Sequence, residues 1–196
     1  MASELCDLQA AQAAFPVTEA IWHLKQNHII ALPSDTLYGL FTPLFGGDLR
    51  RLHEMKGRSY DHPFLVILPE KYDIGTLADL SSMSREAVAK MKELWPGRFS
   101  LVMKKNPSLQ YPPGDTIGLR VVKFEDNPFF YRVLEAFGEP LVGPSLNLHG
   151  QTPLDDPALM ERDFAGVDRI FFDRSFEPSG PSEIWDLTHE PFGRLR

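Results

Sequence analysis

The sequence predicts a single α/β domain in which helices flank a twisted, open, mixed sheet. Segments with helical spacing alternate with short β-rich runs, which is typical of layered α/β or α+β domains. The 196 residues suffice for one substantial core, and no repeat, low-complexity tract or linker divides them. We therefore expect one domain over residues 1–196.

The first half of the chain is expected to contain two helices and two strands. Residues 17–26 and 48–55 carry apolar side chains at helical spacing. A β-rich run at 28–32 is stopped by a proline. The continuous apolar run at 63–68 is typical of a strand that is buried on both faces.

The second half is expected to alternate in the same way. Ser84 is the expected cap of a helix over 84–94, and Pro128 suits the first position of a helix over 127–137. A further helix is expected over 157–164. The remaining β-rich runs are expected as strands at 99–103, 116–122, 141–142, 169–172 and 182–187.

The charge of the chain limits the kinds of ligand that it can bind. A net charge of −7 opposes broad binding to nucleic acid or acidic membranes, because such binding requires an extended cationic surface. Residues 90–123 nevertheless hold seven basic and two acidic residues, whereas residues 155–196 hold five basic and ten acidic. An anionic ligand is expected to bind mainly in the first two-thirds, although a solvated surface would show the same local excess.

The N-terminal region and the single cysteine indicate the compartment. Cys6 alone excludes an intramolecular disulfide and a cysteine-based zinc cluster. No basic segment precedes a hydrophobic stretch near the N-terminus, and no apolar run approaches the roughly 20 residues that cross a bilayer. The sequence therefore predicts a cytoplasmic protein with no membrane partner.

Several catalytic signatures are absent from the sequence. It contains no P-loop, no dinucleotide-binding glycine motif and no nucleophile elbow. The stretch HEMKG begins like a zinc-protease motif but has Gly57 in place of the second histidine, so no metal site is predicted. We expect chemistry that relies on positioning and charge neutralisation.

Polar clusters lie at the edges of the predicted strands, where open sheets build ligand sites. Lys56 and Arg58 would project to the same side of an extended segment, where an ammonium and a guanidinium suit a polyphosphate. Ser145 and Asn147 follow one strand, and Arg120 ends another. Each cluster also has a structural alternative: cations at a helix C-terminus, turn residues that satisfy backbone groups, or a surface salt bridge.

Taken in order, these clusters resemble the YrdC-like family of threonylcarbamoyl-AMP synthases. The resemblance covers residues 18–194, and the chain resembles the short, single-domain form of the family. It is carried by PSDTLYGL (33–40), KGRSYDHP (56–63), LWPGRFSLV (94–102), TIGLR (116–120), GEPLVGPSLNLHG (138–150) and PSEIWDL (181–187). It implies a twisted sheet around a large, concave, positively charged cavity.

The resemblance also implies an activity. Such proteins are nucleotidyltransferases that join L-threonine, bicarbonate or CO2, and ATP into threonylcarbamoyl-adenylate and pyrophosphate, with Mg2+ accompanying ATP. A partner transferase then passes the threonylcarbamoyl group to adenosine 37 of tRNA. No covalent enzyme intermediate is needed, which agrees with the missing nucleophile.

The resemblance assigns roles to matching positions. Lys56 and Arg58 would be catalytic, because they would neutralise charge that builds on the phosphates. The residues expected to contact the nucleotide are His62, Thr116, Ser145, Asn147 and Arg194. Those expected to contact threonine are Ser34, Arg120 and Ser182, with Arg120 binding the carboxylate.

The sequence departs from the family pattern at several positions. Ser34 replaces a threonine, Ser59 a proline and Leu146 a small residue expected beside the nucleotide, while Ile67 and His149 replace a usual histidine and serine. Leu146 and Ile67 motivate one alternative, a divergent paralogue that adenylates another carbamate. A non-catalytic RNA-binding module is the other alternative.

Overall fold

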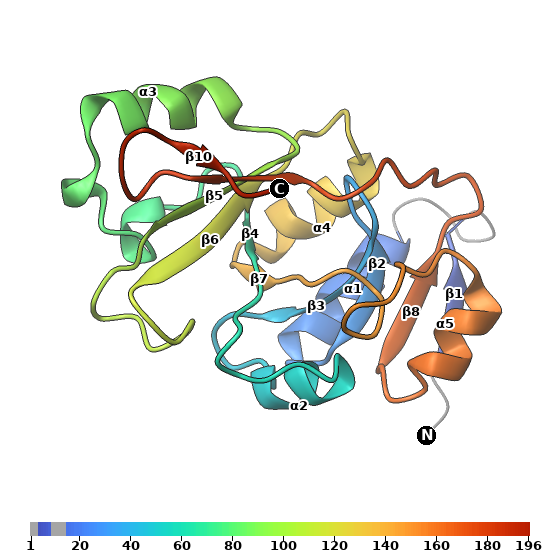
Figure 1. Ribbon diagram of the computed structural model, residues 1–196. Coiled ribbons are helices and arrows are strands. Elements are labelled where there is room, and N and C mark those ends of the chain that lie inside the picture. Colours follow the sequence, from blue (N-terminus) through green and yellow to red (C-terminus); the bar gives the residue numbers. More distant parts are fainter. Residues whose placement is uncertain (1–3, 9–14) are drawn as a thin grey trace.

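The computed structural model describes residues 4–8 and 15–196, and it confirms an α/β fold with a mixed sheet (Figure 1). Within these residues, ten strands form the sheet in the order β1-β8-β2-β3-β7-β4-β6-β5-β9-β10. The strands are β1 (Glu4–Asp7), β2 (Ile30–Pro33), β3 (Tyr38–Pro43), β4 (Val66–Leu68), β5 (Phe99–Lys104), β6 (Thr116–Val121), β7 (Leu141–Val142), β8 (Arg169–Phe172), β9 (Glu183–Asp186) and β10 (Gly193–Arg194). The α-helices are α1 (Phe15–Lys25), α2 (Leu49–Met55), α3 (Arg85–Leu94), α4 (Pro128–Phe137) and α5 (Pro157–Asp163).

Every helix and strand predicted from the sequence is present, with bounds that shift by a few residues. The caps explain why the helices begin as predicted: the side chain of Ser84 accepts a hydrogen bond from the Ala87 N–H, and Asn127 accepts one from the Phe130 N–H. Three strands were missed, namely β1, β3 and β10. β3 forms a hairpin with β2, joined by the four-residue turn 34–37.

Successive residues of the central strands enter two different cores. In β4, Val66 and Leu68 join one core while Ile67 joins the other; in β8, Ile170 and Phe171 divide in the same way. The predicted burial of β4 on both faces is therefore confirmed. This double burial explains why the strands read as continuous apolar runs.

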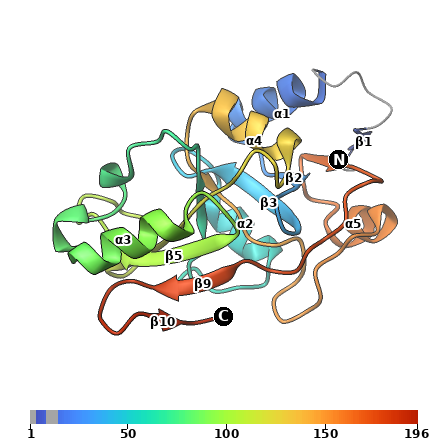
Figure 2. The same ribbon diagram turned by 90° about the horizontal axis from the view of Figure 1, so that it is seen from above.

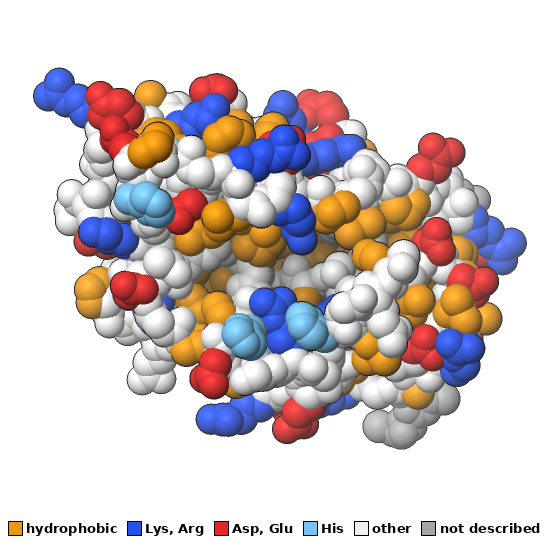
Figure 3. Space-filling view, viewed as in Figure 1, with side chains coloured by type: hydrophobic (Ala, Val, Ile, Leu, Met, Phe, Trp, Pro, Cys, Tyr) orange, Lys and Arg blue, Asp and Glu red, His pale blue; other side chains and the backbone are white. Residues whose placement is uncertain are grey.

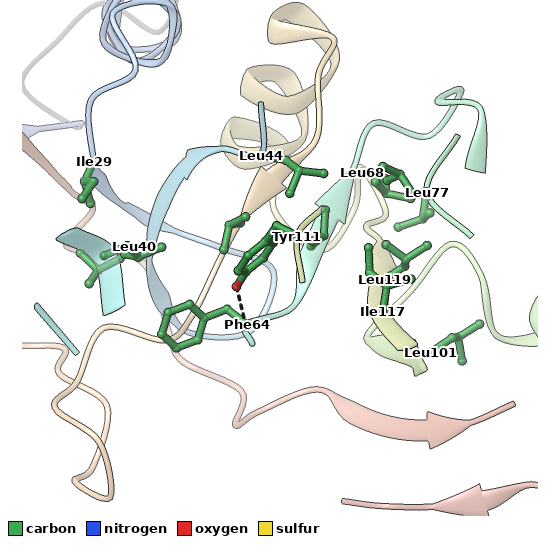
Figure 4. Close-up of a cluster of buried hydrophobic side chains, with 14 of the residues drawn as sticks. Ile29, Leu40, Leu44, Phe64, Leu68, Leu77, Leu101, Tyr111, Ile117 and Leu119 are labelled. Carbon is green, nitrogen blue, oxygen red and sulfur yellow. Dashed lines mark hydrogen bonds between the residues drawn. The ribbon is translucent and has the colours of Figure 1, made fainter. Parts of the chain in front are cut away.

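Helices cover both faces of the twisted sheet. On one face, here called the inner face, α1 and α4 pack against each other and against the sheet (Figures 1 and 2). Side chains such as Leu24 and Phe130 form the core on this face, here called the inner core. The core on the opposite face, here called the outer core, contains side chains from α2, α3 and α5, such as Leu52, Ala87 and Met160. Figure 4 shows part of it. No helix in the described ranges is long and apolar enough to span a membrane.

The two inner helices cover only part of their face of the sheet. Beyond them the face continues through Gly39 of β3 and Gly143, which follows β7. A Cβ atom on Gly39 or Gly143 would lie 2.6 Å from the ring of Phe41. Glycine at these two positions makes room for the Phe41 ring, and both glycines and this ring line a hollow on the same face.

Candidate active site

A hollow of about 330 Å³ opens on the inner face of the sheet, and Figure 3 shows it near the centre of the surface. Segments distant in sequence meet there. Seven of the ten predicted site residues line it: Ser34, Lys56, Arg58, Arg120, Ser145, Asn147 and Ser182. Among the described residues of its lining, four carry a cationic side chain and none carries a carboxylate: Lys56, Arg58, Arg120 and Arg196. A chain with a net charge of −7 thus concentrates positive charge in one cavity.

Three predicted site residues lie outside this lining. His62 is exposed on the loop before β4. Thr116 is at the other end of β6, four residues and therefore about 13 Å from Arg120. Arg194 is directed elsewhere, with its Nε 3.6 Å from a carboxylate oxygen of Glu183.

Sequence reasoning missed other residues of the lining. Arg196 lines the hollow in place of Arg194, and its Nε donates a hydrogen bond to the Ser182 carbonyl oxygen at 3.2 Å. The tail contains both arginines, and no pattern in it distinguishes them. Thr36 and His149 also line the hollow. Thr36 lies within the PSDTLYGL motif, so its neighbours were a usable signal.

Four of the lining residues, here called the loop group, come from two loops: Lys56, Arg58, Ser145 and Asn147. Lys56 caps α2 in helical conformation, and Gly57 follows with a φ of 58°. The prediction of an extended segment at 56–58 was therefore wrong. The left-handed conformation of Gly57 turns the chain, and both cations line the same hollow after this turn.

Lys56 connects the two loops of the loop group. Its side chain is buried, and its Nζ donates to the carbonyl oxygens of Ser145 and Asn147 and, at 2.8 Å, to the side-chain oxygen of Asn147. An ammonium has three donors, so all of them have an acceptor. Burial and the charge of Arg58 lower the pKa of Lys56 to about 7, while the three oxygens favour the charged form. Lys56 therefore lines the hollow although its side chain is almost entirely buried.

Ser145 and Asn147 complete this arrangement. The Ser145 hydroxyl donates to the Asn147 side-chain oxygen at 2.6 Å. The Asn147 amide donates to the carbonyl oxygens of Leu148 and Gln151. Both residues therefore satisfy neighbouring polar groups, as the turn alternative held, and they line the hollow as well.

Arg58 differs from Lys56 in its partners. Its guanidinium lies 5.2 Å from the centroid of the Phe64 ring, a cation–π contact. Its Nε is buried and, within residues 4–8 and 15–196, has no hydrogen-bond acceptor. Because the side chain lines the hollow and its guanidinium makes no hydrogen bond to a described residue, Arg58 has donors left for a ligand.

Four other lining residues, here called the sheet group, come from strands or their ends: Ser34, Thr36, Arg120 and Ser182. Arg120 is buried in β6, with its Nη2 2.9 Å from Oδ1 of the buried Asp35. Its Nη1 donates to the Thr36 hydroxyl at 3.3 Å. Burial raises the pKa of the Asp35 carboxyl, and the charge of Arg120 opposes this effect. The guanidinium is thus held by a fixed partner.

The two serines of the sheet group are held by neighbouring groups. The Ser34 hydroxyl donates to the Leu37 carbonyl oxygen at 2.6 Å and accepts from the Thr36 N–H at 3.2 Å, which shapes the turn between β2 and β3. The Ser182 hydroxyl lies 3.0 Å from that of Ser100 in β5. These contacts fix where each hydroxyl oxygen borders the hollow.

Two departures from the family pattern have no contact with the hollow. Leu146 is fully buried in the outer core, and Ile67 is buried in the inner core; neither lines the cavity. The prediction that the Leu146 side chain adds bulk beside the nucleotide was therefore wrong, because this side chain is buried in the outer core. The two observations that motivated a divergent substrate therefore no longer favour it.

The residues of the hollow do not suit a metal ion held by the protein. In the described part of the chain, no group of three or more His, Cys, Asp or Glu side chains is placed to hold one. Hard divalent cations prefer carboxylate oxygens, which the described lining lacks. The arrangement suits an anionic ligand instead, with a charged guanidinium in each group.

Comparison with known proteins places this site in a family. A family model that carries the names Sua5, YciO and YrdC, and is described as "Telomere recombination", matches residues 23–196. The chain belongs to this family. The match includes both groups of the hollow, so the motif resemblance seen in the sequence is confirmed.

Individual relatives extend the comparison. The "Threonylcarbamoyl-AMP synthase" of Klebsiella pneumoniae is 30% identical over 184 residues, which cover 90% of this chain and 94% of the relative. The protein of the same name from Bacillus subtilis is 32% identical over 139 residues, which cover 69% of this chain and only 39% of the relative. The crystal structure of P. abyssi Sua5 complexed with L-threonine has a TM-score of 0.84 at 24% identity, over 99% of this chain and 57% of that one. This last likeness concerns the fold alone.

Proposed function

We propose that this protein is a threonylcarbamoyl-AMP synthase, a nucleotidyltransferase that forms threonylcarbamoyl-adenylate and pyrophosphate from L-threonine, bicarbonate or CO2, and ATP. The observation that carries the proposal is the hollow with four cations and no carboxylate in its described lining. A polyphosphate and the carboxylate of an amino acid are both anions that such a lining would bind. The names of the Klebsiella and Bacillus relatives, and the threonine in the P. abyssi structure, support this choice.

The two groups suit the two substrates. The planar fork of Arg120 would bind the threonine carboxylate, with the hydroxyls of Ser34 and Ser182 beside it. Arg58 would bind the phosphates, because its guanidinium has donors available. Lys56 would contribute its positive charge, while its hydrogen bonds keep the two loops in place.

The proposed reaction needs no side-chain nucleophile. The threonine amine adds to CO2 and loses a proton, which forms a carbamate. A carbamate oxygen then attacks the α-phosphorus of ATP, and the bond from that phosphorus to the bridging oxygen breaks as pyrophosphate leaves. The charges of Lys56 and Arg58 would stabilise the negative charge that builds on the departing phosphates.

The remaining components follow from this chemistry. Mg2+ would arrive bound to ATP, because the described lining lacks the carboxylates that would hold this ion by itself. The product would be used by a transferase that modifies adenosine 37 of tRNA. Since ATP is a substrate and the product would serve the modification of tRNA, we expect the reaction in the cytoplasm.

An omission assay tests the proposal. Pyrophosphate release should require ATP, threonine and bicarbonate together, and mass spectrometry should detect threonylcarbamoyl-adenylate. Release that continues without threonine would contradict the proposal, and so would a higher rate with serine or another amine. Binding of tRNA that weakens steeply with salt, without any ATP turnover, would favour an RNA-binding module instead.

A further inference from the structure

We propose that a buried chain of hydrogen bonds through His53 and Tyr111, here called the relay, positions Arg58 and thereby sets the affinity for the phosphates of the substrate. His53 and Tyr111 do not line the hollow, so neither would touch the ligand. Because the inference rests on the proposed function, its test measures ATP binding separately from product formation.

The relay begins at the backbone of Arg58. His53, in the last turn of α2, is only 3% exposed, and its Nδ1 lies 3.3 Å from the Arg58 carbonyl oxygen. A carbonyl oxygen can only accept, so Nδ1 carries the proton and donates it. In a neutral imidazole Nε2 is then the acceptor, and burial lowers the pKa of His53, which favours the neutral ring.

The relay continues to the backbone of Phe64. The Tyr111 hydroxyl lies 3.3 Å from His53 Nε2 and donates to it. The same hydroxyl accepts a hydrogen bond from the Phe64 N–H at 3.0 Å, drawn as a dashed line in Figure 4. Two buried side chains therefore connect the backbone of Arg58 with that of Phe64.

Both ends of the relay act on the same guanidinium. The Phe64 ring faces the Arg58 guanidinium at 5.2 Å, and the His53 ring stacks on the Phe64 ring at 4.1 Å with an interplanar angle of 23°. Since the Arg58 Nε has no acceptor within the described residues, ring contact and backbone position are what hold this cation in place. Loss of the Tyr111 hydroxyl would therefore weaken the restraint on the Phe64 ring and the restraint on the Arg58 backbone together.

Tyr60 supplies a matched control for Tyr111. Its ring lies 5.0 Å from the His53 ring, comparable with the 6.2 Å of Tyr111, and it also contacts Tyr111 at 5.6 Å. No hydrogen bond of the Tyr60 hydroxyl to any described residue accompanies these contacts. Tyr60→Phe and Tyr111→Phe therefore remove the same atom from neighbouring rings, but only the second removes a member of the relay.

The test compares dissociation constants for ATP and for threonine, measured by calorimetry on the full chain, in wild type, Tyr111→Phe and Tyr60→Phe. We expect Tyr111→Phe to weaken ATP binding about ten-fold, because a buried N–H and a ring nitrogen each lose a partner. Threonine binding should be unchanged, since Arg120 and Asp35 do not contact the relay. Tyr60→Phe should change neither constant.

A second pair of variants keeps the test decisive if Tyr111→Phe does not fold. His53→Asn retains a donor near the position of Nδ1, whereas His53→Leu retains only bulk, so ATP should bind more tightly to the first. Equal ATP affinity in these two variants, or equal weakening of ATP and threonine binding in Tyr111→Phe, would overturn the relay. Wild-type protein that binds ATP normally but makes no threonylcarbamoyl-adenylate would overturn the proposed function and leave the relay testable by ATP binding. Wild-type protein that binds no ATP would overturn both.

Discussion

The sheet group and the loop group border the same hollow but hold their charges in different ways. In the sheet group, the charge of Arg120 is balanced by the buried Asp35 at 2.9 Å. In the loop group, Lys56 donates to three uncharged oxygens, and the Arg58 guanidinium lies over an aromatic ring. Arg120 thus has a carboxylate partner within the protein, whereas among the described residues neither cation of the loop group has one.

This difference predicts how changes in the two groups divide between stability and function. A partner within the protein contributes to the stability of the free protein, whereas a cation without one contributes when an anionic ligand binds the folded state. Changes in the sheet group should therefore affect the free protein first, and changes in the loop group should affect function more.

Asp35→Ala should destabilise the free protein most. It leaves the buried Arg120 without its partner, and loss of one member of a buried pair costs about 3–5 kcal/mol. Urea denaturation measures the change, with Asp163→Ala as control because the ion pair of Asp163 with Arg162 is at the surface. If both variants unfold at the same urea concentration as wild type, the sheet group does not depend on this pair.

Lys56→Met should destabilise the protein and reduce turnover together. Methionine replaces the length of the side chain but removes a charged donor from three oxygens of Ser145 and Asn147, and among the described residues the Asn147 carbonyl oxygen has no other donor, so the cost is about 3 kcal/mol. Denaturation without ligand gives the stability, and pyrophosphate release gives the turnover. A variant with wild-type stability and low turnover would show that Lys56 serves the ligand alone.

Arg58→Gln should reduce turnover about 100-fold while the free energy of unfolding stays nearly constant, because the lost donors face a ligand and not the protein. Arg50→Gln is the matched control. The Arg50 guanidinium also lies over an aromatic ring, that of Tyr60 at 5.1 Å, but it does not line the main hollow. Equal turnover in the two variants would contradict the role given to Arg58.

Anion affinity should fall modestly as pH rises through 7. The pKa of Lys56 is lowered to about 7 from 10.5, so the ammonium is mostly charged at pH 6 and mostly neutral at pH 8.5. Sulfate, whose own charge is constant in this range, should bind about five-fold more weakly at pH 8.5 than at pH 6. Lys56→Met should flatten the profile, and His149→Asn tests the imidazole in the same lining. A flat wild-type profile would mean that the three oxygens keep Lys56 protonated.

Local patterns in the sequence predicted the elements whose causes are local. Ser84 and Asn127 cap their helices as expected, and the apolar run before Pro69 became a doubly buried strand. β3 was missed because Gly39 and Pro43 are poor strand residues. Its pairing with β2 and β7 is what makes it a strand, and that pairing is not visible in its own composition.

The site was predictable as a set of residues but not as a set of contacts. The motifs brought Lys56 and Asn147 into one hypothesis, yet their hydrogen bond joins residues 91 positions apart and follows from the turn at Gly57. Leu146 was expected beside the ligand but is buried in the outer core, because adjacent residues of a loop can face a cavity and a core in turn. Asp35 was overlooked as the partner of Arg120, since a carboxylate's function here depends on a strand far away in the sequence.

The incomplete cover that α1 and α4 give to the inner face has a consequence for how this architecture accommodates substrates. A further helix over Gly39 and Gly143 would bury more apolar surface and leave no room for chemistry. The molecule instead leaves part of this face uncovered. Under the proposed function, bound substrates would cover that part of the face, and the release of products would expose it again while α1 and α4 stay packed on the rest.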